Sequence, residues 1–371
     1  MLLCSVCCCS PKEDGLVSEI VVNNNKVIIT NVNRLKADTI AIPLSSLVED
    51  YNLVQLEYTE EALINPSWTT ITEKYIGVLQ ANESYKLFDR SGKFLCSVGS
   101  VGQGPGEYST LYDDFIDDAN ELIFLTPFIG NKIFIYNTSG VFLKEIVATQ
   151  RLVNTRVFLS EEILTVIHMP DTNDKAMITQ FDVNTGLVLN ETIAPANVFE
   201  NSYEYGIYNS RNISDTFDFI HTSNDTLYHF DVKNNLIKPV FTLKHNTSDE
   251  TTLQHYLCQL NKDLIMSFVF NKGLILTDIN SKRASWVKLK NDYFGNMEIP
   301  ASIVNFRNGY YVHNIQPEQL MDDIEQRLSE STCPEKDKQM LHKTLLTLKK
   351  GENNVVLVGK LKKSVSKFIG G

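Results

Sequence analysis

Short runs of alternating apolar and polar residues, separated by turn residues, extend from about residue 50 to the end of the chain. This pattern predicts short β-strands, because successive side chains of a strand point to opposite faces. A longer unit then recurs: a strand, a gap, an alternating strand ending in an aromatic residue plus Asp or Asn, a turn with Gly, and another strand. The clearest copies span 75–98 and 122–146, and weaker copies begin near residues 163, 217, 264 and 302.

The repeat has a period of roughly 40–50 residues, which is typical of propeller blades built from four-stranded sheets. The sequence therefore predicts an all-β protein, a six-bladed β-propeller of four-stranded antiparallel blades, as a single domain over residues 37–371. Strands at 53–58 and 354–361 are expected to pair in the sixth blade, which would close the ring and leave no unpaired edge. Residues 1–36 are assigned to a leader and a polar, Asn-rich tether that includes an edge strand.

One helical segment, residues 316–351, interrupts the strands of the last blade. Pro317 fits the first position of a helix, Pro334 starts a second helix, and Gly351 fits its end. The apolar residues that share a face of the first helix are Leu320, Met321, Ile324 and Leu328. We expect a helical hairpin packed on the outside of the blade, with a partner-binding helix as the alternative.

Composition narrows the classes of partner. The 371 residues include 34 Lys+Arg and 45 Asp+Glu, a formal net charge of −11. Such an acidic balance argues against nucleic acid, because phosphate binding needs a basic surface. No apolar run approaches the ~18–20 residues of a membrane-spanning helix. We expect a monomeric folded head that has no nucleic-acid partner.

Four of the seven cysteines lie in the first nine residues. This start resembles a bacterial lipoprotein signal, in which a box of small residues precedes a cysteine that becomes lipidated. Cys9 is the first candidate for lipidation and Cys8 the alternative, and the acidic residues that follow resemble the surface-export tethers of Bacteroidota lipoproteins. The other interpretation is a Cys-rich cytosolic start or a metal-binding tract, although consecutive cysteines lack the spacing that wraps one ion.

Two segments carry a resemblance to a known family. Phe88-Asp-Arg-Ser-Gly-Lys-Phe-Leu-Cys-Ser-Val-Gly99, followed by Gly102-Gln-Gly-Pro-Gly-Glu-Tyr108, resembles the six-bladed β-propeller lipoproteins of Bacteroidota, which are similar to NHL-repeat propellers. The strand at 353–362 also resembles the closing strand of that family. The resemblance implies the fold and an outer-membrane lipoprotein of the cell envelope, facing the periplasm or the surface, that touches the membrane only through its lipid. It brings no settled activity.

The glycine-rich loop of that motif is the first candidate binding site. Its residues are Gly102, Gly104, Pro105, Gly106, Glu107 and Tyr108. It joins the outer strand of one blade to the inner strand of the next, and we expect it on one face near the propeller axis. A purely structural turn is the alternative, since Gly permits left-handed backbone and Pro fixes one turn residue. A phosphate cradle lacks support because no Gly-Lys-Ser/Thr and no helix follow the loop.

Titratable residues provide weaker candidates. An enzymatic interpretation would use Glu204, Asp218 or His221 with Arg211, as a glycosidase needs two facing carboxylates and a uronic-acid lyase needs a base and an Arg. The acidic group Asp113, Asp114, Asp117 and Asp118 lacks the calcium-loop pattern and is interpreted as a solvated turn. His221 is expected to oppose Tyr228 in a hairpin rather than His229, which disfavours a shared metal.

The sequence therefore favours a non-catalytic binding or scaffold module for a glycan or protein partner, with no cofactor and no metal. A carbohydrate-active hydrolase or lyase with an axial active site is the alternative. A purely structural role is the third interpretation.

Overall fold

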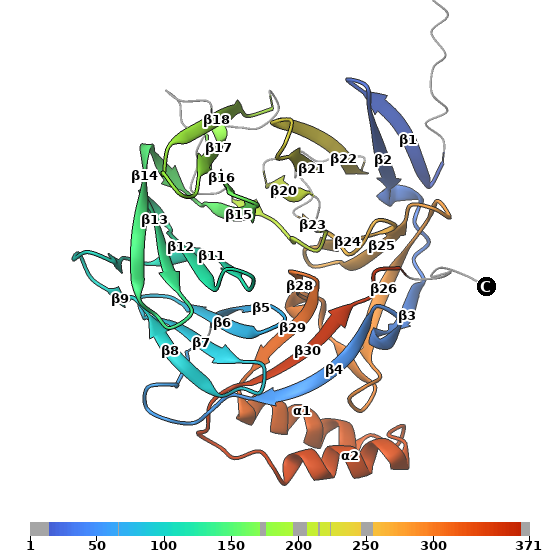
Figure 1. Cartoon of the computed structure of the whole chain (residues 1–371). Coiled ribbons are helices and arrows are strands. Elements are labelled where there is room, and N and C mark those ends of the chain that lie inside the picture. The colour runs from blue at the N-terminus through green and yellow to red at the C-terminus, as the bar shows by residue number, and fades with distance from the viewer. Residues whose placement is uncertain are drawn as a thin grey trace, which may run out of the picture.

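The computed structural model describes residues 15–65, 67–170, 176–195, 206–213, 216–222, 224–245 and 255–364. Six antiparallel sheets are arranged radially around a central axis, so the chain is a six-bladed β-propeller (Figure 1). The sequence-based prediction of the fold class is confirmed. The proposed lipidation site, Cys9, lies outside the described residues.

The first three blades each consist of four consecutive strands, from the axis outward. Blade 1 contains β5 (Ser67–Ile71), β6 (Tyr75–Gln80), β7 (Tyr85–Asp89) and β8 (Phe94–Val98). Blade 2 contains β11 (Leu111–Asp117), β12 (Leu122–Pro127), β13 (Ile129–Asn137) and β14 (Phe142–Val153). Blade 3 contains β15 (Arg156–Ser160), β16 (Ile163–Ile167), β17 (Ala176–Asp182) and β18 (Val188–Ile193).

Blades 4 and 5 gain additional strands at their outer edges. Blade 4 contains β19 (Ile207–Tyr208), β20 (Phe217–His221), β21 (Thr226–Asp231) and β22 (Leu236–Lys244), and blade 5 contains β23 (His255–Gln259), β24 (Leu264–Val269), β25 (Gly273–Asp278), β26 (Arg283–Asn291) and β27 (Met297–Ile299). The hairpin of β1 (Val17–Val22) and β2 (Asn25–Asn31) joins blade 4 through a parallel pairing of β2 with β22. In the same way β3 (Thr39–Pro43) runs parallel to β26 in blade 5.

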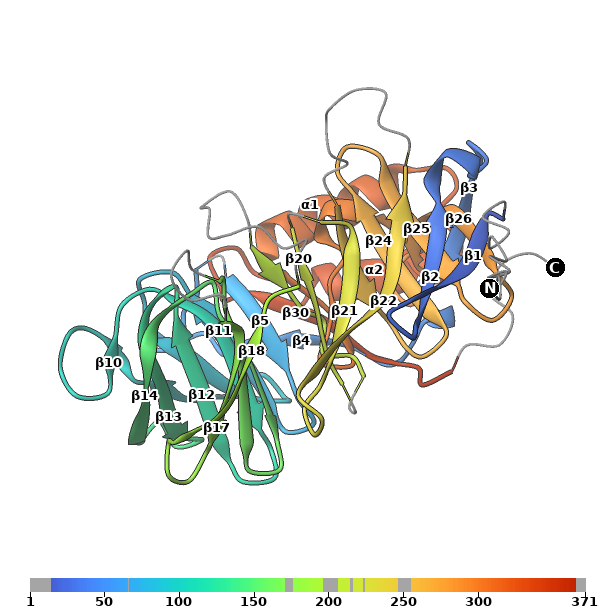
Figure 2. The same cartoon turned by 90° about the horizontal axis from the view of Figure 1, so that it is seen from above.

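The amino-terminal strands therefore lie against two neighbouring blades, at the end of the molecule opposite β10 in Figure 2. The sequence predicts a tether with an edge strand over residues 15–36, a segment that contains residues 17–31. They instead form a two-stranded extension of the blade 4 sheet, so the expected boundary at residue 37 does not coincide with the start of the sheets.

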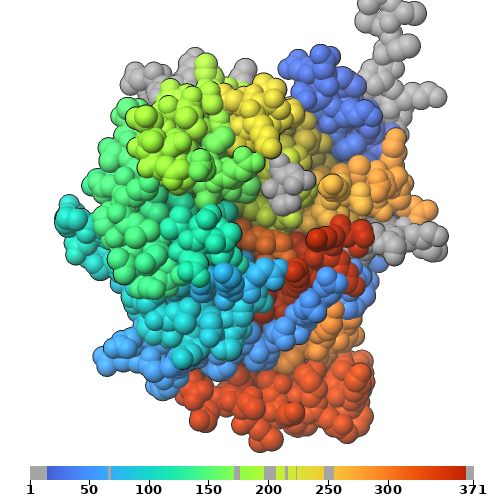
Figure 3. Space-filling view, viewed as in Figure 1, coloured from blue at the N-terminus to red at the C-terminus, as the bar shows by residue number. Residues whose placement is uncertain are grey.

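Blade 6 is assembled from both ends of the chain. It contains β28 (Phe306–Arg307), β29 (Tyr310–Ile315), β30 (Val355–Leu361) and β4 (Val48–Gln55). The last two strands pair antiparallel, from Val355 opposite Gln55 to Leu361 opposite Val48. They lie side by side as red and blue atoms in Figure 3. The predicted closure of the ring is confirmed, although the amino-terminal strand starts five residues earlier than the pattern indicated.

Two helices are inserted between β29 and β30 and lie outside the ring in Figure 1. They are α1 (Pro317–Ser329) and α2 (Glu335–Leu345). Pro317 occupies the first helical position, where its missing N–H would have no intrahelical partner in any case. Leu320, Ile324 and Leu341 are buried against Leu357 of β30, so the hairpin covers the outside of blade 6 as expected.

Turn chemistry connects the outer strands of the first two blades in the same way. The Asp89 carboxylate accepts the Ser91 N–H at 2.8 Å, and the Asn137 side chain accepts the Ser139 N–H at 3.0 Å. Gly92 and Gly140 follow with φ of +91° and +79°, a conformation that glycine adopts without strain. The two repeat copies therefore share their turn as well as their strands.

Candidate functional site at the propeller axis

The innermost strands bring charged side chains together at the centre of the ring. The group, called here the axial ion cluster, comprises Asp113 and Asp114 on β11, Arg156 on β15, Arg211 after β19, and Arg307 on β28. All five residues are buried. They belong to blades 2, 3, 4 and 6, so the cluster connects blades that are distant in sequence.

Asp113 is the hub of this cluster. Its Oδ1 lies 3.7 Å from Arg156 Nη1 and 3.5 Å from Arg211 Nη2, and it also accepts a hydrogen bond from Arg307 Nη2. Its Oδ2 accepts the Val157 N–H at 3.0 Å. Burial alone would raise the pKa of the Asp113 carboxyl, but the three guanidinium groups outweigh it and hold that pKa below its usual value. Asp113 is therefore ionised at neutral pH.

Asp114 and Arg211 complete the buried layer. The Asp114 carboxylate accepts hydrogen bonds from Thr70 Oγ1 and from the Tyr85 hydroxyl, both at 2.8 Å. Arg211 Nη1 donates to the carbonyl oxygens of Asp114 at 3.0 Å and Val157 at 2.8 Å. Burial, together with the neighbouring Arg307, lowers the pKa of Arg211 to about 10, so its guanidinium keeps its charge at neutral pH.

A β-bulge immediately precedes these acidic residues on the innermost strand of blade 2. The register of β11 against β12 shifts between Leu111 and Asp113, which leaves Tyr112 as an extra residue. After the bulge the pairing is regular, so Asp113 and Asp114 point to opposite faces of the blade, and both faces are buried here. The Tyr112 ring supports the Arg156 guanidinium, whose carbon lies 4.2 Å from the ring centre.

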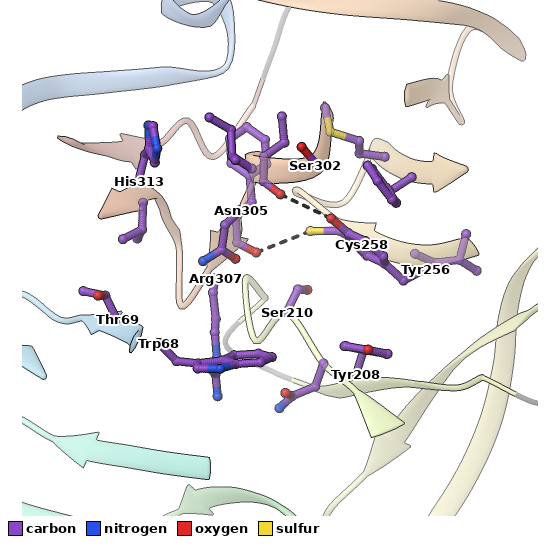
Figure 4. A pocket seen from close by; sticks show the side chains of 18 of the residues that line it. Trp68, Thr69, Tyr208, Ser210, Tyr256, Cys258, Ser302, Asn305, Arg307 and His313 are labelled. Atoms are coloured by element: carbon purple, nitrogen blue, oxygen red, sulfur yellow. Dashed lines mark hydrogen bonds between the residues drawn. The ribbon is translucent and has the colours of Figure 1, made fainter. Parts of the chain in front are cut away.

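An open cavity of about 430 Å³, called here the axial pocket, lies on one side of the cluster (Figure 4). Its lining is Trp68, Thr69, Arg156, Tyr208, Asn209, Ser210, Tyr256, Leu257, Cys258, Met266, Phe268, Leu274, Ser302, Ile303, Val304, Asn305, Phe306, Arg307, Val312, His313 and Asn314. Within the described parts of the chain, this lining includes two arginines and a histidine and no Asp or Glu.

Aromatic side chains form much of the wall. Tyr256 stacks between Tyr208, at 5.9 Å between ring centres, and Phe268, at 4.8 Å. The Tyr256 hydroxyl donates to the Val304 carbonyl at 3.3 Å, which fixes the ring against blade 6. Trp68 is 55% exposed and lies 6.0 Å from the guanidinium carbon of Arg156. The pocket thus offers an accessible indole face beside a cation.

A smaller hollow of about 260 Å³ lies on the other side of the cluster. Arg211 contributes to its lining together with Thr72, Glu73, Asn308 and Tyr310. Arg156 and Arg307 line the axial pocket, whereas Arg211 lines this hollow, so the ion cluster separates the two cavities. Two arginines of the axial ion cluster therefore face the axial pocket, and the third faces the smaller hollow.

The glycine-rich loop lies elsewhere. Its two ends form β9 (Ser100–Val101) and β10 (Glu107–Tyr108), which lie at the periphery of the ring in Figures 1 and 2. None of the residues from Gly102 to Tyr108 lines the axial pocket. The expectation that this loop lies near the axis is wrong, because the loop folds against the outer half of blade 2.

Contacts within that loop explain its composition. Gly106 has φ of +69°, and a Cβ there would lie 2.6 Å from the Phe142 ring of β14. The Glu107 carboxylate accepts the Gly104 N–H at 2.8 Å, and the Tyr108 hydroxyl donates to the Val98 carbonyl at 2.6 Å. These are the interactions of a structural turn, which is the alternative interpretation of the sequence. A binding role for the loop stays a prediction.

The four candidate catalytic residues have different positions. Glu204 lies outside the described residues. Arg211 belongs to the axial ion cluster, and the Asp218 carboxylate accepts the main-chain N–H of Ser210 at 3.0 Å and of Arg211 at 2.7 Å. His221 is buried, and burial lowers its pKa to about 4. Neither Asp218 nor His221 lines the axial pocket.

Two local interpretations of the sequence are corrected. Asp113 and Asp114 are not part of a solvated turn, since only Asp117 caps the turn that follows, by accepting the Ala119 N–H at 3.0 Å. In the blade 4 hairpin, Phe219 rather than His221 opposes Tyr228. Among the described residues, no group of three or more His, Cys, Asp or Glu is arranged to hold a metal ion.

The grouping of Trp68, Arg156, Arg307 and His313 in one site was not predicted from the sequence. Each stands alone in its own strand, and only the radial arrangement of the blades brings them together. The available signal was their position at the inner strands of the repeat or next to them.

The fold and the axial pocket define the class: a six-bladed β-propeller with a cavity at one end of its axis. A family model described as "Domain of unknown function (DUF4934)" matches residues 26–360. The chain belongs to this family, whose description supplies no activity. No curated protein matches the sequence.

Two solved structures share the fold. One is described as a "Putative exported protein (BF0058)" from Bacteroides fragilis NCTC 9343, with 16% identity, a TM-score of 0.60, and coverage of 88% of this chain and 100% of that chain. The other is a member of the duf4221 family from Bacteroides vulgatus ATCC 8482, with 11% identity, a TM-score of 0.51, and coverage of 85% and 97%. In the described part of this chain, no helix is long and apolar enough to cross a membrane.

Proposed function

We propose that this protein is a non-catalytic binding module that holds the end of a glycan in its axial pocket. The observation that carries this proposal is the open cavity in which the exposed face of Trp68 lies beside hydrogen-bonding side chains. Aromatic faces stack on sugar rings, and amide and hydroxyl groups bond to sugar hydroxyls. The amide and hydroxyl side chains of the lining are Thr69, Asn209, Ser210, Ser302, Asn305 and Asn314.

The size of the pocket supports a glycan end over a protein surface. Its volume of about 430 Å³ lies within the ~300–1,000 Å³ of pockets that enclose small ligands. A protein partner would need a larger, flatter contact area. The competing hypothesis is therefore that a protein partner binds elsewhere on the ring.

Hydrogen–deuterium exchange with a panel of oligosaccharides tests this placement. Ligands that bind should slow exchange in residues 302–307 and 256–258, which form two walls of the axial pocket. Protection confined to residues 100–108 would instead place binding at the glycine-rich loop and would contradict the proposal. Binding of no oligosaccharide would also contradict it.

A carbohydrate lyase is the second candidate function, and one observation favours it over a hydrolase. His313 lines the axial pocket with Arg156 and Arg307, whereas no described carboxylate does. Burial lowers the pKa of His313, so its imidazole is neutral at neutral pH and able to accept a proton. Release of unsaturated, shortened products in the same incubations would replace the binding proposal by this one.

We further propose that the propeller is anchored in the bacterial envelope through lipidated Cys9. The support is the lipoprotein-like start of the sequence and the description of one structural neighbour as an exported protein. The first described strand begins at Val17, which leaves a short polar segment as tether. Mass spectrometry of the mature amino terminus should find a diacylglyceryl cysteine at position 9, and an unmodified Met1 would contradict the anchor.

A further inference from the structure

We propose that the axial pocket selects ligands that carry a carboxylate on the sugar ring, so that its ligand class is the uronic-acid oligosaccharides. This inference rests on the proposed function, because it assumes that a glycan end enters the pocket. It adds the chemical class of the ligand. The described lining contains no carboxylate that would repel an acidic sugar.

The distribution of charge around the pocket is asymmetric. Arg156 and Arg307, which are 2% and 8% exposed, line the cavity, whereas Asp113 and Asp114, which are 0% and 1% exposed, do not. Asp218 is also 1% exposed, and its carboxylate is occupied by main-chain N–H groups and by the Ser210 hydroxyl at 2.5 Å. A ligand in the pocket therefore meets cationic groups first, although the chain as a whole carries a formal charge of −11.

Arg307 keeps unused capacity to donate hydrogen bonds. A guanidinium has five N–H donors in a planar fork. In the described part of the chain, Nη2 of Arg307 donates to Asp113, while Nε is buried and has no hydrogen-bond partner. The side chain is 9% exposed, so it is held rigidly by its surroundings and still contributes to the lining. A planar fork of this kind is complementary to a carboxylate.

The spacing of ring and cation fits a carboxylate attached directly to a sugar ring. The guanidinium carbon of Arg156 lies 6.0 Å from the centre of the Trp68 ring, and it is fixed on its other side by Tyr112 at 4.2 Å. A sugar that packs on the exposed surface of Trp68, beside this guanidinium rather than between ring and cation, would bring a carboxylate on its ring close to the arginines. Figure 4 shows Trp68 and Arg307 in the same part of the cavity.

Calorimetry with matched ligands tests this inference. The probes are oligosaccharides of galacturonic, glucuronic and mannuronic acid, each paired with its carboxyl-reduced neutral counterpart. We expect at least one acidic oligosaccharide to bind about tenfold or more tightly than its neutral counterpart, as charge-assisted hydrogen bonds to arginine are strong. Equal binding of the two would overturn the inference and leave the proposed function intact, whereas binding of neither member of any pair would overturn both.

A variant with an added negative charge tests whether the preference for acidic ligands arises in the axial pocket. Asn305 is exposed in the wall of the pocket, and Asn305→Asp adds a carboxylate there without changing the shape of the side chain. In this variant the affinity for the acidic ligand should fall several-fold more than the affinity for its neutral counterpart, so that most of the preference is lost. Asn33→Asp, on the exposed turn Val32–Arg34, is the matched control and should behave like the unaltered protein. An unchanged preference in Asn305→Asp would overturn the inference.

Discussion

Asp113→Asn is expected to lower the free energy of unfolding by about 3–5 kcal/mol, the cost of removing one partner of a buried ion pair. The substitution keeps the size of the side chain and an oxygen that accepts the Val157 N–H. It removes the negative charge that compensates Arg156, Arg211 and Arg307. Three buried guanidinium groups would then face only Asp114, which is already bonded to Thr70 and Tyr85.

Urea unfolding measures this effect through the shift in the transition midpoint at an unchanged slope. The matched control is Asp322→Asn, an exposed aspartate of α1, which should stay within about 0.5 kcal/mol of the unaltered protein. A change in Asp113→Asn no larger than in this control would mean that the axial ion cluster does not stabilise the ring.

The fold was predictable because its signals are local. The turns at Asp89 and Asn137 place an Asp or Asn three residues before a Gly with positive φ, and that combination is readable in a single segment. Pro317 likewise marks the start of α1 without reference to any other part of the chain. Repetition of such signals at a constant period is sufficient to predict the blades and their number.

The axial site was not predictable because its residues are far apart in sequence. Asp113 and Arg307 are 194 residues apart, and their contact depends on the closure of the ring. Burial on both faces of β11 is a second obstacle, since Asp113 bonds to Val157 of blade 3 and Asp114 bonds to Thr70 of blade 1. Four acidic residues within six positions therefore looked like a surface turn.

For the glycine-rich loop, the sequence predicted a position near the propeller axis that the structure does not show. Gly102, Gly104 and Gly106 suggested close approach to a ligand, but the side chains that approach them belong to the chain itself. Glu107 lies against the first two and Phe142 against the third. A distinctive motif can therefore report a constraint on the backbone, and it then says little about binding.

Trp68→Ala is expected to weaken binding of the best oligosaccharide by about 30-fold or more, the effect of truncating an aromatic residue that dominates a binding site. In the proposed complex the exposed face of this indole supplies the stacking surface, and its loss would leave the ligand with polar contacts alone. The fold should not change, because Trp68 is 55% exposed. Trp68→Phe, which keeps an aromatic face, should recover part of the affinity.

The most direct test of ligand binding at the propeller axis is therefore the dissociation constant of Trp68→Ala, measured by calorimetry beside that of Tyr58→Ala. Tyr58 is equally exposed, at 56%, and does not line the axial pocket. We predict a large loss of affinity in Trp68→Ala, none in Tyr58→Ala, and the same unfolding midpoint in both. Unchanged affinity in Trp68→Ala, with the protein folded, would contradict binding at the propeller axis.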